Sequence, residues 1–323
     1  MTVTGLESNN HQSNRLWGIA CYFNPAGYRN RLANYRTFIE NLSVPLVAVE
    51  LSYGSEFELG PGDATILIQV KGSDVLWQKE RLLNIALAAL PEQCDAVAYL
   101  DADVVFERND WAERSLTLLE SVPLIQPFAD FCDLPPQTNP RQFRPEADAL
   151  SGRSLAAMVK DGYTPHQLLQ TCGARFKSAI PSAGGFAWVV RRSILDRHGF
   201  YDTCIVGSGN HAMVAATYGV PDLSVSSLCM NESRAEHFLS WAEPYFQEVG
   251  GQVGYLTGAI YHLWHGDLED RKYRERHESF STFNFNPTED IRLDEKGCWQ
   301  WSSDKPAMHN YVREYFNSRK EDG

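Results

Sequence analysis

Strand and helix patterns alternate over the first hundred residues, and this alternation constrains the fold more than any other feature of the sequence. Apolar runs of roughly four to eight residues are typical of buried strands, and apolar residues recurring every three or four positions are typical of amphipathic helices. We expect strands at 16–23, 44–51, 64–70 and 96–100 and helices at 28–42 and 75–90. Such alternation predicts a doubly wound α/β fold, in which ligands bind at the carboxyl ends of parallel strands.

Two carboxylates follow the fourth expected strand directly. Asp101-Ala102-Asp103 stands between the apolar runs 96–100 and 104–106. In an extended chain residues i and i+2 point to the same side, so Asp101 and Asp103 can face one cation. Carboxylate oxygens suit Mg²⁺ and Mn²⁺, which proteins commonly hold together with substrate phosphates. The pair indicates a nucleotide-diphosphate site, although a bare D-x-D is also compatible with an exposed turn between two strands.

Polar residues mark the ends of other expected strands. Asn24 follows the first strand, and Glu50 lies near the end of the second. Because the carboxyl ends of parallel strands meet at one edge of a sheet, both residues are expected near Asp101. Glu50 is a candidate for a nucleotide contact, with an ordinary strand-end acid as the alternative.

The second half of the chain adds three features that bear on a site. Four prolines in 134–145 and two short helical stretches form either the wall of an acceptor pocket or a surface loop. The glycine-rich segment 207–211 precedes an expected helix at 212–218, whose first N–H groups could hold an anion or a sugar hydroxyl. An expected strand at 255–264 leads to His262 and His265. Further elements are expected as a strand at 186–190, helices at 193–198, 232–249 and 311–316, and a hairpin at 294–297.

Composition narrows the class of partner and the compartment. The 323 residues carry a formal net charge of −12, which disfavours nucleic acid as a partner because such a site needs a basic face. No stretch approaches the roughly 18 apolar residues of a membrane span, and the polar N-terminus lacks the pattern of a signal peptide. The cysteines form no C-x-x-C pair, which indicates reduced thiols and a cytoplasmic location. The seven cysteines are residues 21, 94, 132, 172, 204, 229 and 298.

The order of these motifs resembles that of nucleotide-sugar glycosyltransferases of the GT-A fold, with β-1,4-galactosyltransferases and polypeptide N-acetylgalactosaminyltransferases as analogues. The matching landmarks, in order over 16–277, are a loop after the first strand (22–31), the helical segment WQKERLLN (77–84), the D-x-D, a Gly-Gly strand, a glycine-rich segment and a late histidine. Residues 207–213 also look like the G-S-G-D-H-H-M segment of uncharacterised bacterial and phage glycosyltransferases. Residues 315–322 look similar to the ends of those proteins.

The resemblance implies a GT-A (Rossmann-like) α/β fold with a mixed, centrally parallel sheet flanked by helices. It implies a metal-dependent hexosyltransferase that moves a sugar from a nucleoside-diphosphate sugar, UDP-sugar first, to a hydroxyl of a carbohydrate or other acceptor. Mn²⁺ or Mg²⁺ would be the cofactor. The helix before the D-x-D would contact the nucleoside through Trp77 and Lys79. In the alternative, Trp77 is a core aromatic residue and Lys79 a solvated charge on an ordinary amphipathic helix. The implied nucleotide-binding residues are Tyr22, Asn24, Glu50, Trp77, Lys79, Arg81 and Asp101.

The resemblance also implies a metal site made of Asp101, Asp103 and a late histidine. His262 and His265 are three residues apart on an expected strand and should face opposite sides, so we expect only one of them to reach the metal. We prefer His265, because Gly266 marks the end of the strand. The cations that follow are either solvated helix charges or neutralise the leaving diphosphate. They are Arg271, Lys272, Arg274 and Arg276.

The catalytic base is where the sequence departs from the resemblance. Galactosyltransferases carry G-G-E-D, with the second acid as base, where this chain has Ser208-Gly209-Asn210-His211. His211 is our expected base, because a pKa of about 6.5 leaves an imidazole largely neutral at pH 7, and Asn210 would orient the acceptor by hydrogen bonding. In the alternative, His211 caps the helix or packs in the core. Asp130 and Asp133 are then the next acids to consider.

We expect one catalytic domain over 16–323 after a disordered N-terminus at 1–15. Its nucleotide-binding half would span about 16–130, its acceptor-binding half about 131–285, and a C-terminal hairpin and helix about 286–323. The oligomeric state is not indicated.

Two other functions stay open. A nucleotidyltransferase would also bring a metal to a nucleotide phosphate, but it needs a glycine-rich basic loop after the first strand, and residues 24–27 are poor in glycine. A sugar-binding relative that has lost turnover is favoured by the missing carboxylate near 210. Donor hydrolysis or transfer would reject this second alternative.

Overall fold

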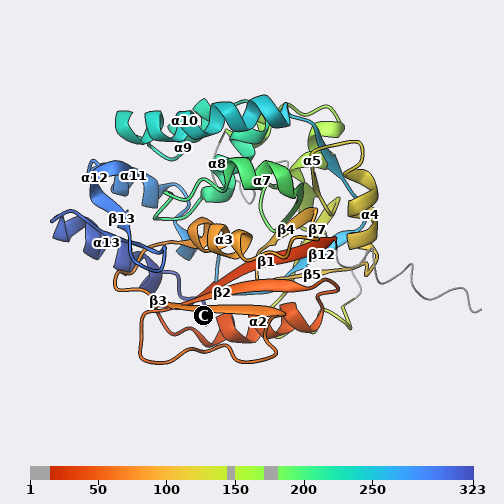
Figure 1. The fold of residues 1–323 in the computed structure, drawn as a ribbon, viewed down its shortest axis with the longest axis horizontal. Coiled ribbons are helices and arrows are strands. Elements are labelled where there is room, and N and C mark those ends of the chain that lie inside the picture. The colour runs from red at the N-terminus through yellow and green to blue at the C-terminus, as the bar shows by residue number, and fades with distance from the viewer. Residues whose placement is uncertain (1–14, 144–149, 171–180) are drawn as a thin grey trace, which may run out of the picture.

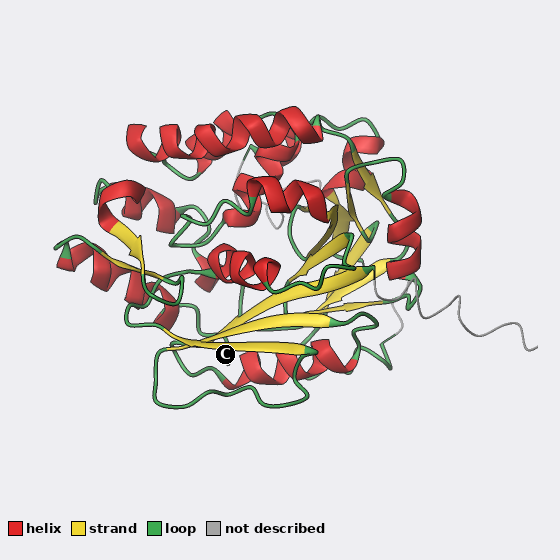
Figure 2. Cartoon of the chain, viewed as in Figure 1, coloured by secondary structure: helices red, strands yellow, loops and turns green. Residues whose placement is uncertain are grey.

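A computed structural model describes residues 15–143, 150–170 and 181–323 (Figure 1). The segment expected to be disordered, 1–15, lies outside the described residues except for Arg15. A twisted sheet forms the central layer, and helices lie on both of its faces (Figure 2).

The large sheet has seven strands in the order β11-β6-β10-β4-β1-β2-β3. Four neighbouring strands are parallel, whereas β10 runs antiparallel to both β4 and β6. This arrangement confirms the expected mixed, centrally parallel sheet. Its strands are β1 (Leu16–Phe23), β2 (Leu46–Ser52), β3 (Ile66–Lys71), β4 (Ala96–Leu100), β6 (Leu124–Gln126), β10 (Ala187–Arg191) and β11 (Val253–Tyr255).

Alternate residues of β1 pack under helices on opposite faces of this sheet. Ile19 shares a fully buried cluster with Leu82 of α3 (Lys79–Ala88), whereas Ala20 packs in another cluster with Tyr35 of α2 (Arg29–Glu40). Figure 1 shows α3 and α2 on the two sides of the strands. Strands covered on both faces are apolar throughout, which explains why continuous apolar runs predicted them correctly.

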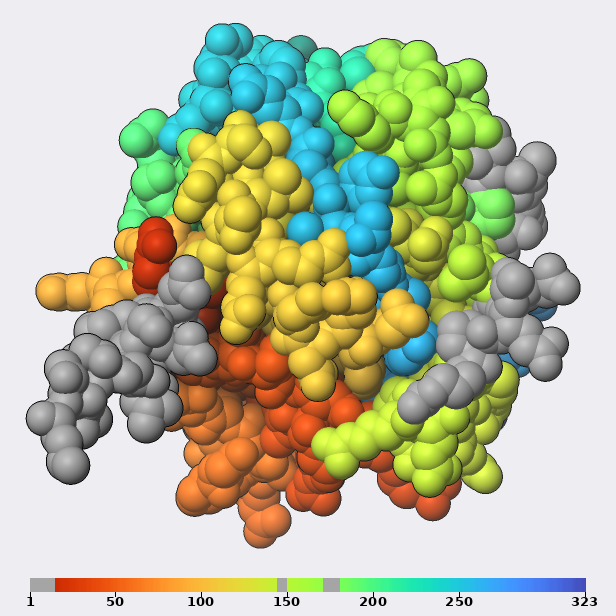
Figure 3. All heavy atoms as spheres, turned by 90° about the vertical axis from the view of Figure 1, so that its right-hand side faces the viewer, coloured from red at the N-terminus to blue at the C-terminus, as the bar shows by residue number. Residues whose placement is uncertain are grey.

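A second sheet of five strands lies beside the first, in the order β5-β12-β7-β8-β9. In Figure 3 the light blue surface belongs to the segment that contains β11 and β12. It lies between yellow residues of the first half of the chain and yellow-green residues that come later in the sequence than the yellow ones. Both sheets therefore combine strands from the two halves of the chain. The strands are β5 (Val104–Phe106), β7 (Asp130–Asp133), β8 (Gly152–Ser154), β9 (Ser182–Ala183) and β12 (Ala259–His262).

The expected strand at 255–264 is wrong in one respect, because the structure divides it between the two sheets. β11 ends at Tyr255 beside β6, and β12 begins at Ala259 between β5 and β7. Gly258 between them has a φ of +125°, a backbone conformation that residues other than glycine rarely adopt. The chain turns there, so His262 ends a strand of the small sheet and His265 lies in the segment just after it.

The other helices cover the sheets and the C-terminal side. The expected helix at 232–249 is α10, and the expected hairpin is the pair β13 and β14. The terminal helix begins earlier than expected, at Pro306, a residue that suits the first turn of a helix. The remaining elements are α4 (Trp111–Leu118), α5 (Leu155–Lys160), α6 (Pro165–Leu169), α7 (Arg192–His198), α8 (Gly209–Thr217), α9 (Pro221–Ser227), α10 (Glu232–Val249), η3 (Glu269–Arg271), α11 (Glu275–Ser281), α12 (Pro287–Asp290), β13 (Ile291–Leu293), β14 (Trp299–Trp301) and α13 (Pro306–Asn317).

The structure bears on two expectations about the compartment, the lack of a membrane span and the reduced cysteines. Within the described ranges no helix is both long and apolar enough to cross a membrane. Cys21, Cys94, Cys229 and Cys298 are free thiols, as expected, and Cys172 lies outside the described residues.

Candidate active site

A cavity of about 350 Å³ opens beside the carboxyl ends of β1 and β4. The sequence analysis predicted a ligand site at this edge of the parallel strands. This volume is in the usual range for small-ligand sites, about 300 to 1,000 Å³. Of the expected site residues, nine line it: Tyr22, Trp77, Lys79, Asp101, Asp103, Asn210, His211, His262 and His265. The proline-rich residues 134–143 do not line it, whereas residues of α5 and α6 do.

The two aspartates of the D-x-D have different partners. Asp101 forms an ion pair with the Lys79 ammonium, and its Oδ2 accepts a hydrogen bond from the Phe186 N–H at 3.1 Å. Lys79 also donates to the Asn210 Oδ1 at 3.3 Å. Asp103 instead faces the small sheet. The chain passes from one sheet to the other between the aspartates, so the same-side geometry expected of a single extended strand does not apply.

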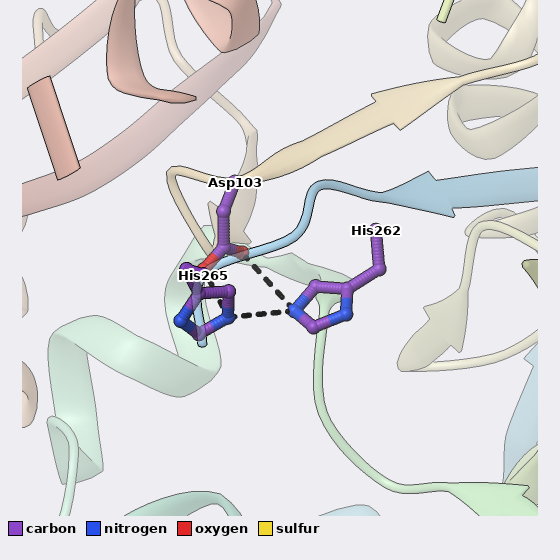
Figure 4. A group of neighbouring side chains, drawn as sticks. All are labelled: Asp103, His262 and His265. Atoms are coloured by element: carbon purple, nitrogen blue, oxygen red, sulfur yellow. Dashed lines mark hydrogen bonds and ion pairs between the residues drawn. The ribbon is translucent and has the colours of Figure 1, made fainter. Parts of the chain in front are cut away.

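Asp103 lies with both late histidines, as Figure 4 shows. Its Oδ2 is 3.1 Å from the His265 Nε2, its Oδ1 is 3.9 Å from the His262 Nε2, and the two Nε2 atoms are 2.9 Å apart. Ligand atoms of the three residues lie within 4.8 Å of one another. The expectation that only one histidine reaches this point is wrong, because β12 ends at His262 and the following chain turns, with the Leu263 N–H bonded to the Asp103 carbonyl oxygen at 2.8 Å.

The three side chains fit a divalent metal. His262 donates from Nδ1 to the Asp133 carboxylate at 2.7 Å, and its Nε2 is the ring atom that faces Asp103 and His265. A carboxylate behind a histidine in this way is the usual support of a metal ligand. The Asp103 Oδ1 is buried and has no hydrogen-bond partner, so it lacks the compensation that buried carboxylates need. Two imidazoles with one carboxylate suit Mn²⁺ better than Mg²⁺.

Electrostatics keep this group ready to bind a cation. Burial, followed by the nearby Arg271 guanidinium, holds the pKa of His265 well below its usual value, so the ring is neutral at pH 7. Burial raises the pKa of Asp103, although His262 opposes this effect. A divalent ion would relieve the cost of keeping this carboxylate ionised.

Four arginines line the same cavity, and only two of them were expected. Arg271 and Arg276 come from the predicted basic cluster, whereas Lys272 and Arg274 do not line the cavity. Arg31 and Arg319 join them, and the sequence analysis did not single out either one.

Glu321 is the acid that lies among these arginines. It contacts Arg31 at 2.6 Å and Arg319 at 2.5 Å. Burial acts to raise the pKa of Glu321, but the two guanidinium groups outweigh it and hold the pKa at about 2. With one carboxylate against four guanidinium groups, this part of the cavity is positively charged and suits an anion.

Trp77 and Tyr22 form the aromatic part of the lining. The Trp77 ring stacks on Phe316, with centroids 5.9 Å apart, and the Arg319 guanidinium lies 4.9 Å from the centroid. Tyr22 donates from its hydroxyl to Glu58 at 2.7 Å.

Three expected nucleotide-binding residues do not line the cavity. Glu50 is buried and accepts hydrogen bonds from the backbone N–H groups of 58 and 59 and from the Gln69 amide. Asn24 donates to Glu58, which lies between β2 and β3, and accepts from the Tyr28 N–H in its own loop. Arg81 points from α3 to Asp202, at 3.1 Å. Hydrogen bonds to other parts of the protein thus hold these three side chains in place outside the cavity.

His211 lines the cavity, but both of its ring nitrogens are bonded within the protein. Nε2 lies 3.2 Å from the Leu169 carbonyl oxygen, which can only accept, so Nε2 carries the proton. Nδ1 then accepts from the Ser224 hydroxyl at 2.7 Å. Burial lowers the pKa of His211 to about 4. This geometry favours the packing alternative over the expected role as base.

Glu80 is a second residue that the sequence analysis did not single out. It is only 3% exposed and lines the cavity, beside the Lys79–Asp101 pair and against Gly209. Burial raises the pKa of Glu80 to about 7. The N-terminus of α8 stabilises a nearby carboxylate by about 0.3–1 kcal/mol. The rise in the pKa of Glu80 corresponds to about 3 kcal/mol, at about 1.4 kcal/mol per pKa unit. The helix N-terminus therefore does not offset the effect of burial.

Solved structures similar to this chain include several sugar-transferring enzymes. Glucosyl-3-phosphoglycerate synthase from Mycobacterium tuberculosis, in complex with Mn²⁺, UDP and phosphoglyceric acid, is 12% identical over 90% of this chain and 87% of that chain, with a TM-score of 0.44. The Pyrobaculum calidifontis mannosyltransferase PcManGT, in complex with GDP-Man and Mn²⁺, is 14% identical over 93% and 69%, with a TM-score of 0.42. Drosophila β-1,4-galactosyltransferase 7 is 10% identical over 92% and 98%, with a TM-score of 0.40. No protein-family model and no curated protein matches the sequence significantly.

The first prediction concerns metal selectivity. Mn²⁺ should bind more tightly than Mg²⁺, because two of the three ligand groups are imidazoles. His262→Gln and His265→Gln should each weaken Mn²⁺ binding by more than tenfold, and Asp133→Asn by about 10- to 100-fold through loss of support for His262. Titration calorimetry of the nucleotide-free protein measures these affinities, with exposed Asp95→Asn as control. An Mn²⁺ affinity in both histidine variants equal to that of the wild type would contradict the site.

The second prediction concerns pH and Glu80. Because its pKa is raised on folding, the folded protein binds this proton more tightly than the unfolded chain, so stability falls as pH rises from about 4.5 to about 7. Glu80→Gln removes this loss and should gain up to about 3 kcal/mol on the wild type between pH 5 and pH 8. Urea unfolding at both pH values measures the difference, with exposed Glu92→Gln as control. A Glu80→Gln effect that is the same at pH 5 and pH 8 would contradict the raised pKa.

Proposed function

We propose that the protein is a metal-dependent glycosyltransferase that moves a sugar from a nucleoside-diphosphate sugar, UDP-sugar first, to an acceptor hydroxyl. One observation carries the proposal: a metal-binding group, an arginine cluster and an aromatic side chain line a single cavity at the carboxyl ends of parallel strands. A nucleoside diphosphate needs these three kinds of contact together, for its phosphates, its charge and its base.

Asp103, His262 and His265 would hold the metal, and Asp133 would fix the orientation of His262. A divalent ion there would supply charge stabilisation for the departing phosphate. Asp101 would act differently, by holding Lys79 at the cavity through their ion pair. The two aspartates of the D-x-D would therefore have different roles: Asp103 would bind the metal, and Asp101 would position the Lys79 cation.

Arg271, Arg276 and Arg319 would neutralise the remaining charge of the diphosphate. Guanidinium groups bind phosphate oxygens through paired N–H donors, and a buried site strengthens each contact. Trp77 would pack against the nucleoside, with Tyr22 beside it. Asn210, whose Oδ1 accepts from Lys79, would orient the sugar or the acceptor with its amide hydrogens.

The acceptor would enter on the side of α5 and α6. Leu155 and residues 167–169 line this part of the cavity, and they belong to the half of the chain from about 131 to 285 that we assign to the acceptor. Acceptors with hydroxyl groups, carbohydrates among them, fit the proposal. A cytoplasmic location, with reduced cysteines, belongs to the same proposal.

The third prediction tests donor binding. UDP should bind in the presence of Mn²⁺, and Asp103→Asn should weaken this binding at least tenfold by removing the only carboxylate of the metal group. Arg319→Met should weaken UDP binding with or without metal, because it removes a cation from the anion site. Calorimetry with UDP, GDP, UDP-Gal, UDP-GlcNAc and GDP-Man, each with and without Mn²⁺, measures both effects and identifies the base.

Exposed Arg29→Met is a matched control for the arginine variant, since Arg29 lies outside the cavity. Binding of nucleoside triphosphates in preference to every diphosphate would favour the nucleotidyltransferase alternative. Donor binding without any hydrolysis or transfer would favour a sugar-binding protein. Failure to bind any of these nucleotides would contradict the proposal.

A further inference from the structure

A transfer to a hydroxyl group needs a proton acceptor, and the segment at the start of α8 does not supply one. The segment 208–211 contains no carboxylate, and both nitrogens of His211 are engaged by Ser224 and Leu169. Asn210 is an amide and cannot take the proton at neutral pH.

A carboxylate from another element fills the space beside the first residue of α8. A Cβ atom at position 209 would lie 2.1 Å from the Glu80 Oε1 and 2.2 Å from its Cδ, so the carboxylate occupies the place of a side chain at 209. Only glycine leaves this room. Glu80 therefore extends from α3 to the first residue of α8 and presents its carboxylate at the cavity.

The charges around Glu80 leave its carboxylate able to exchange a proton. Lys79, the cation beside it, is paired with Asp101 and bonded to Asn210. Across the described ranges, no ion pair within 4.0 Å involves Glu80. One ammonium thus serves two carboxylates, and its direct contact is with the other one.

We propose that Glu80 is the general base of the transfer, an inference that rests on the proposed glycosyltransferase function. The acceptor oxygen forms a bond to the anomeric carbon while the bond from that carbon to the diphosphate breaks. The electron pair of the broken bond leaves with the nucleoside diphosphate, and the acceptor proton passes to the Glu80 carboxylate. Bulk solvent takes this proton after the products depart.

This role of Glu80 also gives a function to its neighbours Gly209 and Lys79. Gly209 gives Glu80 access to the cavity, and Lys79 is held away from Glu80 by Asp101. A raised pKa, near the working pH, is the property that suits a general base. Such a base contributes about 10²- to 10⁴-fold to the rate.

The test uses hydrolysis of the donor, in which water replaces the acceptor. Wild type, Glu80→Gln, His211→Gln and the surface control Glu92→Gln are compared with Mn²⁺ and the donor that binds best among UDP-Gal, UDP-GlcNAc and GDP-Man. Glu80→Gln should lose about 10²- to 10⁴-fold in kcat with the UDP affinity changed less than twofold. The rise of the wild-type rate through neutral pH should disappear in this variant. Glu80→Ala should regain activity with added formate, which restores a carboxylate but not a packing contact.

The outcomes separate the two proposals. Binding and hydrolysis by the wild type with near-normal kcat in Glu80→Gln would overturn the role of Glu80 and leave the glycosyltransferase intact. Loss of activity in His211→Gln alone would return the role to His211. Absence of both donor binding and hydrolysis in the wild type would overturn the proposed function and Glu80 with it. If Glu80→Gln does not fold, Glu80→Asp replaces it, and an unchanged kcat in that shorter acid would overturn the assignment.

Discussion

The passage of the chain from one sheet to the other at Asp101–Asp103 is the constraint on which the site depends. β4 ends at Leu100 in the large sheet, and β5 begins at Val104 in the small one. The Asp101 N–H bonds to the Phe186 carbonyl oxygen at 2.8 Å, and the Leu263 N–H bonds to the Asp103 carbonyl oxygen at the same distance. One short connection is thereby tied to both sheets, and its two carboxylates face different neighbours.

This separation divides the charges of the cavity into regions. The Lys79–Asp101 pair and Glu80 lie towards α8, the Asp103 group lies at the end of the small sheet, and the arginines with Glu321 come from the start of α2 and from the C-terminal part of the chain. Only the arginine region carries a clear excess of positive charge, since it sets four guanidinium groups against Glu321, whereas the other two regions contain the carboxylates of Asp101, Glu80 and Asp103. A ligand that carries both a diphosphate and a neutral sugar matches this division.

Local patterns in the sequence predicted the elements well, and contacts between distant residues explain where prediction failed. β1 and α10 have the expected bounds, since burial on both faces and helical periodicity are visible in a continuous stretch. The break at Gly258 was missed, because a single glycine does not reveal that two sheets meet there. The prediction that only one histidine reaches Asp103 failed for the same reason, because it assumed that one continuous strand carries both histidines.

The site residues follow the same rule. Trp77, Lys79, Asp103 and Asn210 were identified from motifs and line the cavity. Glu80 lies within the quoted segment 77–84, and Arg319 and Glu321 lie within 315–322, but nothing in those stretches marks which charge turns inward. Glu50 illustrates the reverse case, since an acid at a strand end is satisfied by backbone N–H groups of the next loop.

The division of roles between the two aspartates is the central claim, and a crystal structure with Mn²⁺ and UDP tests it most directly. Anomalous scattering locates the manganese without reference to the protein. The account predicts a manganese ion bonded to Asp103, His262 and His265, with Asp101 still paired with Lys79. A manganese ion bonded to Asp101 and to neither histidine would contradict it.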